Sequence, residues 1–227
     1  VVSWVQFCRG WRTDLPALAE VAHAAGALLC VDAIQGLGCI PAHFDEWGVD
    51  FAMADGHKYL LGPEGIGALY VRRSCLDRLR PLEPGWASVA HRERWDNLDL
   101  AWHPDARRLE GGSPNSAGIH GLGAALDLLG AAGVENIWRH VDGLCDHACA
   151  GLAAAGAEVL SDRSPAGRSG IVTFRLPGHG PAAVVTHLLG AGIVGAPRGG
   201  GVRVSPHGWN TVEEIERLVA AVADLAR

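Results

Sequence analysis

Short apolar runs alternate with helical periodicity over the first 73 residues of the chain. The runs of strand length are residues 1–7, 27–33, 49–55 and 65–72. After Asp14, a residue that favours a helix N-cap, apolar residues recur at helical spacing at Leu15, Leu18, Val21 and Ala22. The order strand, helix, strand, strand with short polar loops predicts a layered α/β sheet.

The pattern changes after residue 73. Residues 74–112 are rich in Trp, Arg and Pro with little periodicity, so we interpret them as a crossing segment and loops. An α+β pattern follows, with helices predicted over 116–133, 135–155, 181–192 and 211–227 and strands over 157–161, 170–176 and 201–206. Thr211 and Glu214 have the spacing of a capping box. We place a domain boundary within residues 113–135 and divide the chain into 1–120 and 121–227.

Composition and charge exclude several classes of protein. The 227 residues are 48% apolar, which is enough for a sizeable core, and the net charge is −6. The arginines are scattered, which argues against nucleic-acid binding. Gly, His or acidic residues interrupt each apolar stretch before it reaches the length of a membrane span, and the N-terminus lacks the basic region of a signal peptide.

The cysteine pattern indicates reduced thiols of a cytoplasmic protein, because no C-x-x-C spacing is present. The six cysteines are Cys8, Cys30, Cys39, Cys75, Cys145 and Cys149. The last two lie four residues apart with His147 between them, which would make half of a metal site. No second ligand pair follows, so no metal is predicted.

Candidate chemistry centres on Lys58, the one lysine among the 19 Lys and Arg residues. Lysine differs from arginine where an amine must lose its proton or form an imine. Lys58 follows the predicted strand 49–55 by three residues, and open α/β folds assemble ligand sites at the carboxyl ends of strands. We therefore expect a partly buried, nucleophilic amine, with chance survival of a single lysine as the alternative.

Further polar residues lie at the same predicted edge of the sheet. Asp32 ends the strand 27–33, Gln35 follows it by three residues, and His57 precedes Lys58. An Asp could serve simply as a turn or N-cap residue. Together, however, a lysine and a carboxylate on neighbouring strands match the needs of pyridoxal 5′-phosphate (PLP), whose aldehyde binds the amine and whose ring nitrogen pairs with the carboxylate.

Four segments in order carry a family resemblance: VDAIQGLG, DGHKYLLGPEGIGALYVR, EGGSPN and GVRVSPHGWNT. They resemble the class V aminotransferase family, which includes cysteine desulfurases, selenocysteine lyases and isopenicillin-epimerase-like proteins. The resemblance implies a fold-type I PLP enzyme: part of a three-layer large domain with a mostly parallel sheet, followed by a smaller α+β domain. It also implies a homodimer that acts on an amino acid through an external aldimine.

The resemblance also implies a role for individual residues. Lys58 would bind PLP as an imine, Asp32 would pair with the pyridinium nitrogen, Gln35 would donate to the phenolate oxygen and His57 would contact the phosphate. Arg203 would hold the substrate carboxylate, unless it is an ordinary surface or ion-paired arginine; a guanidinium suits a carboxylate because it can bind it bidentately. In addition, Ser113 stands where the family usually has Thr, in a loop that reaches the phosphate of the neighbouring subunit.

Departures from the family pattern leave alternatives open. Asp55 stands where cysteine desulfurases usually have Ser, and we expect it to turn toward His57 or another donor. The segment 193–201 lacks the loop cysteine of desulfurases, which favours transamination, elimination or epimerisation over a cysteine desulfurase or selenocysteine lyase. The family's amino-terminal third is absent from this sequence, so a non-catalytic α/β remnant that does not bind PLP stably is the other reading. Arg198 is a second candidate anion ligand, and residues 199–201 are either a substrate loop or a hairpin turn.

Overall fold

The computed structural model describes residues 1–96 and 99–227 and contains two four-stranded sheets. The strands of the first sheet are β1 (Val2–Ser3), β2 (Cys30–Asp32), β3 (Phe51–Asp55) and β4 (Gly67–Val71), in that spatial order. The β1–β2 and β2–β3 pairs are parallel, and β4 is antiparallel to β3. The carboxyl ends of β2 and β3 therefore meet at one edge of this sheet, as predicted.

Helix α1 (Leu15–Ala24) begins where the sequence predicts, because the Asp14 carboxylate accepts a hydrogen bond from the Ala17 amide at 3.1 Å. Its buried face differs from the expected one. Leu15 and Ala19 are buried, whereas Val21 is 67% exposed. The helix thus presents a narrower apolar stripe to the core than its sequence pattern suggests.

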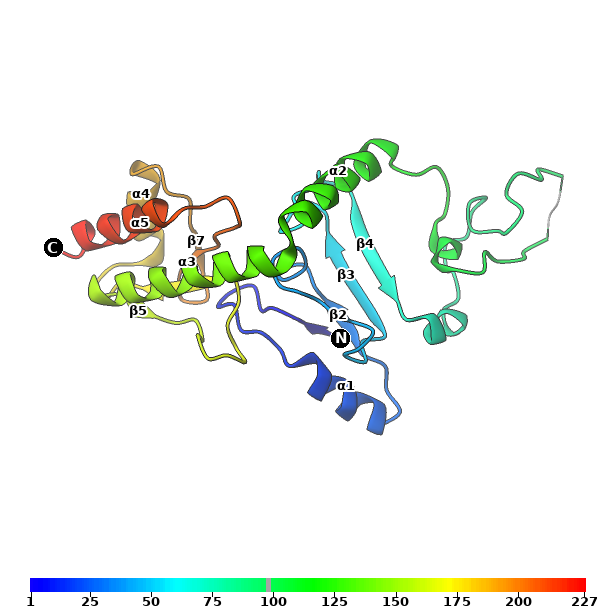
Figure 1. Ribbon diagram of the computed structural model, residues 1–227, viewed down its shortest axis with the longest axis horizontal. Coiled ribbons are helices and arrows are strands. Elements are labelled where there is room, and N and C mark those ends of the chain that lie inside the picture. Colours follow the sequence, from blue (N-terminus) through cyan, green and yellow to red (C-terminus); the bar gives the residue numbers. More distant parts are fainter. Residues whose placement is uncertain (97–98) are drawn as a thin grey trace.

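Helices α2 (Ser116–Ala132) and α3 (Val134–Ala154) join the two halves of the molecule (Figure 1). They are bent by 77° at Gly133, which has a φ of 78° and forms the C-cap of α2. Among the described residues no single helix has the length and hydropathy of a membrane span; only this bent pair, taken together, passes such a test.

The second sheet has the order β5 (Glu158–Val159), β6 (Val172–Arg175), β8 (Gly201–Val204) and β7 (Ala196–Arg198), with antiparallel pairs throughout. Helices α3, α4 (Pro181–Gly190) and α5 (Val212–Leu225) pack with it around fully buried side chains that include Phe174, Val184 and Val222. The predicted capping box of α5 is present. A mostly parallel sheet followed by an α+β unit confirms the predicted fold class, while the division at residue 120 stays a prediction.

The described residues of the stretch 74–112 form an arm that projects from the body at the right of Figure 1. It contains the 3₁₀ helix η2 (Ala106–Leu109) and most of η1 (Arg73–Arg78), and its other described residues form turns and one isolated bridge between Val89 and Trp102. The prediction of loops holds for the described part; residues 97 and 98 of that prediction lie outside it.

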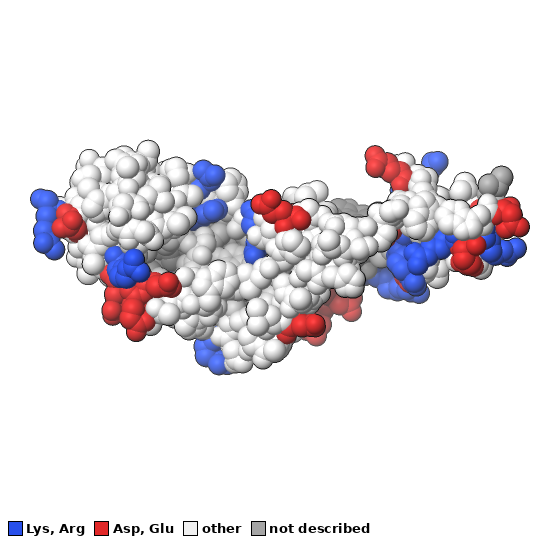
Figure 2. Space-filling view, turned by 90° about the horizontal axis from the view of Figure 1, so that it is seen from above, with Lys and Arg blue, Asp and Glu red and all other residues white. Residues whose placement is uncertain are grey.

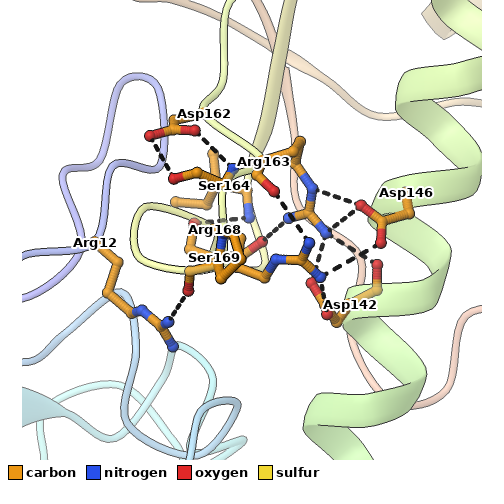
Figure 3. A network of polar contacts seen from close by, with 10 residues as sticks. Arg12, Asp142, Asp146, Asp162, Arg163, Ser164, Arg168 and Ser169 are labelled. Carbon is orange, nitrogen blue, oxygen red and sulfur yellow. Dashed lines mark hydrogen bonds and ion pairs between the residues drawn. The ribbon is translucent and has the colours of Figure 1, made fainter.

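An ionic network ties α3 to the loop before β6 (Figure 3). Arg163 contacts Asp142 at 2.5 Å and Asp146 at 2.9 Å, and Arg168 contacts Asp142 at 2.7 Å. Arg12, from the first half of the chain, donates to the Pro165 carbonyl in the same loop at 2.7 Å. The network therefore helps to fix the second sheet relative to the first.

Candidate functional site

The loop that carries Lys58 is tightly held at the end of β3. The Gly56 amide donates to the Ile66 carbonyl at 2.8 Å, the Gly62 amide to Gly56 at 2.7 Å, and the Leu61 amide to Lys58 at 3.0 Å. Leu61 has a φ of 60°, the one non-glycine residue with a positive φ in the described chain. A bulky residue in this region costs on the order of 1 kcal/mol or more, so the surrounding contacts must impose the conformation.

The two glycines after Asp32 allow a second loop to pack beneath the first. Gly38 has a φ of 96°, and a Cβ at this residue would overlap the Tyr59 carbonyl. A Cβ at Gly36 would lie 2.6 Å from the Trp4 ring. Glycine is therefore required at both positions, and the Gly36–Gly38 turn supports the backbone next to Lys58.

A cavity of about 210 Å³ opens at this edge of the sheet. Its lining residues are Gln35, Lys58, Tyr59, Arg203, Ser205, His207 and Trp209. The fold thus brings Gln35 and Lys58 of the first half to Arg203 of the second, although 145 residues of sequence (203 − 58) separate the last two. Lys58 is exposed, so the partial burial expected from the sequence is not found in this chain.

Asp32 lies at the end of β2, half-buried, and is not among the residues that line this cavity. One carboxylate oxygen accepts from the Ile34 amide at 2.9 Å and the other from the Ser3 hydroxyl at 3.3 Å. An ionised carboxylate has about four acceptor positions, so capacity remains for a further N–H donor. The Asx turn expected of a purely structural Asp is also present.

His57 and Asp55 face each other, with 3.9 Å between His57 Nε2 and an Asp55 oxygen. This is the orientation predicted for Asp55. Both side chains are partly exposed, and His57 is not among the residues that line the cavity of Lys58.

Arg203 reaches the cavity from β8, half-buried. Its Nη1 donates to the Phe7 carbonyl at 2.8 Å, and no carboxylate of the described residues lies within 4 Å of it. Burial lowers the pKa of Arg203, and the positive charge of Arg198 lowers it further. The sequence left open a surface or an ion-paired arginine: among the described residues Arg203 has no ion pair, and its side chain is half-buried.

His207, to which the sequence reasoning gave no role, is buried and connects the two halves at the cavity. It accepts from the Gly208 amide at Nδ1 (2.6 Å), so the proton lies on Nε2, which donates to the Tyr59 carbonyl at 3.0 Å. Burial lowers the pKa of His207, in keeping with a neutral ring. The ring stacks between Tyr59 and Trp209, at centroid distances of 5.3 and 4.3 Å.

His207 and Trp209 lie four and six residues after Arg203, within the last of the four sequence motifs. That proximity was the one available signal for them. The Tyr59 hydroxyl, which follows Lys58 directly, donates to the Gly170 carbonyl at 2.9 Å and is fully buried, so burial raises its pKa well above the usual value.

Ser113 is not brought to Lys58. It is exposed and lines a different hollow, with Ile66, Gly67, Asn115 and Ile119 among its neighbours there. Asn115 caps α2 by accepting from the Gly118 amide at 2.9 Å and donates to the Gly65 carbonyl at 3.0 Å. This loop is therefore fixed next to β4.

The residues at the Lys58 cavity fit PLP by the chemistry of their donor set. An amine, an amide and a guanidinium line one cavity, and a carboxylate with spare acceptor capacity ends the adjacent strand. Basic side chains lie on both sides of the hollow between the two halves in Figure 2, as suits an anionic ligand. Among the described residues no group of three His, Cys, Asp or Glu could hold a metal ion, and all six cysteines are free.

Comparison with known proteins gives a consistent result. The model of the family "Aminotransferase class-V" matches residues 1–218. An uncharacterised aminotransferase, YcbU, of Bacillus subtilis (strain 168) is 34% identical over 98% of this chain and 58% of its own. The apo structure of a cysteine desulfurase from Thermococcus onnurineus NA1 superposes with a TM-score of 0.89 at 27% identity, covering 100% of this chain and 59% of that one.

A third similar protein was solved with a ligand. It is a variant of the cystine C–S lyase C-DES with glycine covalently linked to the PLP cofactor, at a TM-score of 0.88 and 25% identity, covering 99% of this chain and 60% of that one. The chain thus spans slightly more than half the length of each of these relatives.

Proposed function

Because the chain belongs to the class V aminotransferase family, we propose that it forms the lysine-bearing part of a PLP-dependent enzyme that acts on an amino acid. The observation that carries this proposal is that Lys58, Gln35 and Arg203, from distant parts of the sequence, line one cavity at the carboxyl edge of a mostly parallel sheet. Ligand sites of open α/β sheets form at this edge. The solved relative with PLP supports the choice of cofactor.

PLP, when bound, supplies an aldehyde for the amine and a ring that accepts electrons from the substrate Cα. Lys58 would hold it through its Nζ. Asp32 would keep the ring nitrogen protonated, since both of its oxygens are already oriented by hydrogen bonds. Gln35 would donate to the ring oxygen and His57 would contact the phosphate.

Arg203 would orient the substrate by binding its α-carboxylate, because the bond to Phe7 uses one of its N–H groups and leaves the others for a ligand. Lys58, which lines the same cavity as Arg203, would be the base that accepts the proton of the substrate Cα at its Nζ. Removal of that proton is the step shared by transamination, elimination and epimerisation, and the proposal stops at this shared step.

A second candidate, cysteine desulfurase, is favoured by one contact. The β7–β8 turn has no cysteine, but a Cβ built on Gly199 would lie 3.2 Å from Cys8 Cβ, so Cys8 packs on that turn despite its distance in sequence. If the Cys8 thiolate takes the sulfur of cysteine as a persulfide, with alanine as the other product, Cys8→Ala abolishes release of alanine, and of sulfide when an added thiol reduces the persulfide. An unchanged rate of release would leave the first proposal alone.

We also propose that the protein forms a homodimer and is located in the cytoplasm. Ser113 lies away from the Lys58 cavity of its own chain, which supports a role at the phosphate of a second copy in a homodimer. The six free cysteines support a reducing, cytoplasmic environment. Neither a membrane nor a nucleic acid is expected as a partner.

The test is chemical trapping. PLP followed by borohydride should add the mass of the reduced cofactor to the peptide that contains Lys58. Lys58→Arg should prevent the addition and lower turnover by at least about 10²-fold, with an unchanged melting temperature, because Lys58 is exposed. Lack of any mass gain on Lys58 in the wild type would instead support the non-catalytic remnant, as would wild-type turnover by Lys58→Arg.

A further inference from the structure

The β7–β8 hairpin places two arginines on one face of the second sheet. Ala196 pairs with Arg203, and Arg198 pairs with Gly201. Paired residues of an antiparallel ladder project to the same face, and so do residues two apart on one strand. Arg198 and Arg203 therefore extend from the same face at diagonal positions, a separation that two long side chains can bridge.

A third guanidinium comes from the segment that lies on this face. Thr173, which pairs with Arg203, donates from its hydroxyl to the Cys8 carbonyl at 2.6 Å. Arg9 donates from Nε to the Gly199 carbonyl at 3.1 Å, and Arg203 itself donates to Phe7. Arg9, Arg198 and Arg203, termed here the arginine cluster, thus lie along the hairpin, with Arg9 and Arg198 at its turn and Arg203 two residues further along β8 from Gly201.

The arginine cluster has no acidic partner within the described part of the chain. No carboxylate oxygen there lies within 4 Å of any of its three guanidinium groups, although the chain has 25 acidic residues against 19 basic ones. By contrast, Arg163 and Arg168 share two aspartates. Arg198 and Arg203 repel each other enough to affect the pKa of Arg203.

One member of the cluster, Arg203, lines the Lys58 cavity, and several cations without acidic partners are suited to more than one negative charge. The proposed function uses Arg203 for the α-carboxylate of an amino acid. Arg198 donates to the Pro197 carbonyl through Nη1 and is otherwise exposed, as is Arg9. Two guanidinium groups therefore remain available next to the one that would bind the substrate.

We propose that Arg198, assisted by Arg9, binds a second anionic group on the substrate, so that the preferred substrate is an amino acid with an acidic side chain. This inference rests on the proposed function, since it takes Arg203 as the ligand of the α-carboxylate. The chemical class is an amino acid that carries a carboxylate on its side chain. A neutral amide of the same shape would be bound more weakly.

The test compares matched ligands by calorimetry on the PLP-loaded protein. Aspartate and glutamate should bind more tightly than asparagine and glutamine, respectively. Arg198→Gln should weaken binding of the acidic ligands about 10- to 100-fold, as expected for loss of a hydrogen bond to a charged group, with little change for the amides. Arg139→Gln, an exposed arginine on α3, is the control and should change neither.

Three outcomes would overturn the inference. Equal binding of acids and amides, with Lys58 still trapped by borohydride, refutes the acidic substrate and leaves the proposed function standing. Competition by inorganic phosphate without any preference for acidic amino acids means that Arg198 binds a free anion. Absence of trapping on Lys58 removes the proposed function and this inference with it.

Discussion

At the scale of single residues, the site depends on glycines whose conformations no other residue adopts at low cost. Gly38 combines a φ of 96° with close packing, since a Cβ added there would overlap the Tyr59 carbonyl oxygen. Its neighbours in the sequence motif predict a ligand loop but not this close packing, because the packing depends on Tyr59, which lies 21 residues away in the sequence (59 − 38).

Gly38→Ala should therefore lower the free energy of unfolding by about 3 kcal/mol, the sum of backbone strain and overlap with Tyr59. Gly26 is a matched control, because its φ of 71° is similar and nothing lies within 4 Å of the position of its Cβ. Gly26→Ala should cost only about 1 kcal/mol. Equal losses in urea denaturation would show that the Tyr59 contact contributes nothing.

Asp50 is the most buried acidic residue of the described chain, at 2% exposure, and lies at the end of the first sheet remote from the cavity. Burial acts to raise its pKa, but hydrogen bonds from His23, the Leu29 amide and Cys75 outweigh burial, so the pKa is lowered. A lowered pKa in the folded state gives stability that is complete above the unfolded pKa and is lost as the pH falls through the folded pKa.

Asp50→Asn should accordingly destabilise the protein by about 3 kcal/mol at pH 7, because an amide cannot accept from all three donors. The difference between wild type and variant should shrink as the pH falls below about 4. Denaturation curves across this range test the prediction. A difference that is constant with pH would mean that the charge of Asp50 is not what stabilises the fold.

At the scale of elements, the sequence was most informative where periodicity or caps are strong. The helices after Asn115, Gly133 and Thr211 appear within a few residues of their predicted bounds, because each follows a capping residue or a break. Strand β7 was missed, since Ala-Pro-Arg has little strand pattern and forms only because β8 pairs with it. Residues 199–201, for which the sequence allowed a substrate loop or a hairpin turn, connect β7 and β8 as a hairpin turn.

The loop between β5 and β6 illustrates an element held by side chains rather than by backbone pairing. Asp142 of α3 contacts both Arg163 and Arg168, and its side chain is 19% exposed. Asp142→Ala should cost about 2 kcal/mol, because it leaves two partly buried guanidinium groups short of a partner.

The control for Asp142 is Glu158→Gln, in an exposed pair with Arg175, which should cost less than about 1 kcal/mol. Hydrogen exchange of the amides of residues 161–170 should rise in Asp142→Ala only. Unchanged exchange in this loop would show that Asp142 does not hold it.

At the scale of the whole molecule, the candidate site exists only because the two halves of the chain meet. Their contact could not be predicted from the sequence pattern. The carboxyl ends of two strands could be predicted to gather Asp32, Gln35 and Lys58, since strand order follows from pattern. The prediction that Arg203 lies near Lys58 rested on the family resemblance alone. The bonds that place it, from Arg203 to Phe7 and from His207 to Tyr59, join residues 196 and 148 positions apart.

His207 makes this junction sensitive to pH. Its pKa is lowered by burial, and two cations, Lys58 and Arg203, line the same cavity. A histidine that is harder to protonate in the folded state than in the unfolded state destabilises the fold as it gains a proton. Stability is then complete above the unfolded pKa of about 6.5 and falls as the pH drops toward the folded pKa, by at most about 1.4 kcal/mol per pH unit.

His207→Gln should remove this dependence, because an amide can donate to the Tyr59 carbonyl without titrating. Thermal unfolding between pH 7.5 and 5.5 measures the slope, and His179→Gln, at a partly exposed histidine outside the cavity, serves as the control. The wild type and His179→Gln should lose stability over this range while His207→Gln loses less. The His207 ring links the segment that follows Arg203 to Tyr59, which is next to Lys58. If stability depended equally on pH in all three proteins, protonation of His207 would not be what makes this junction sensitive to pH.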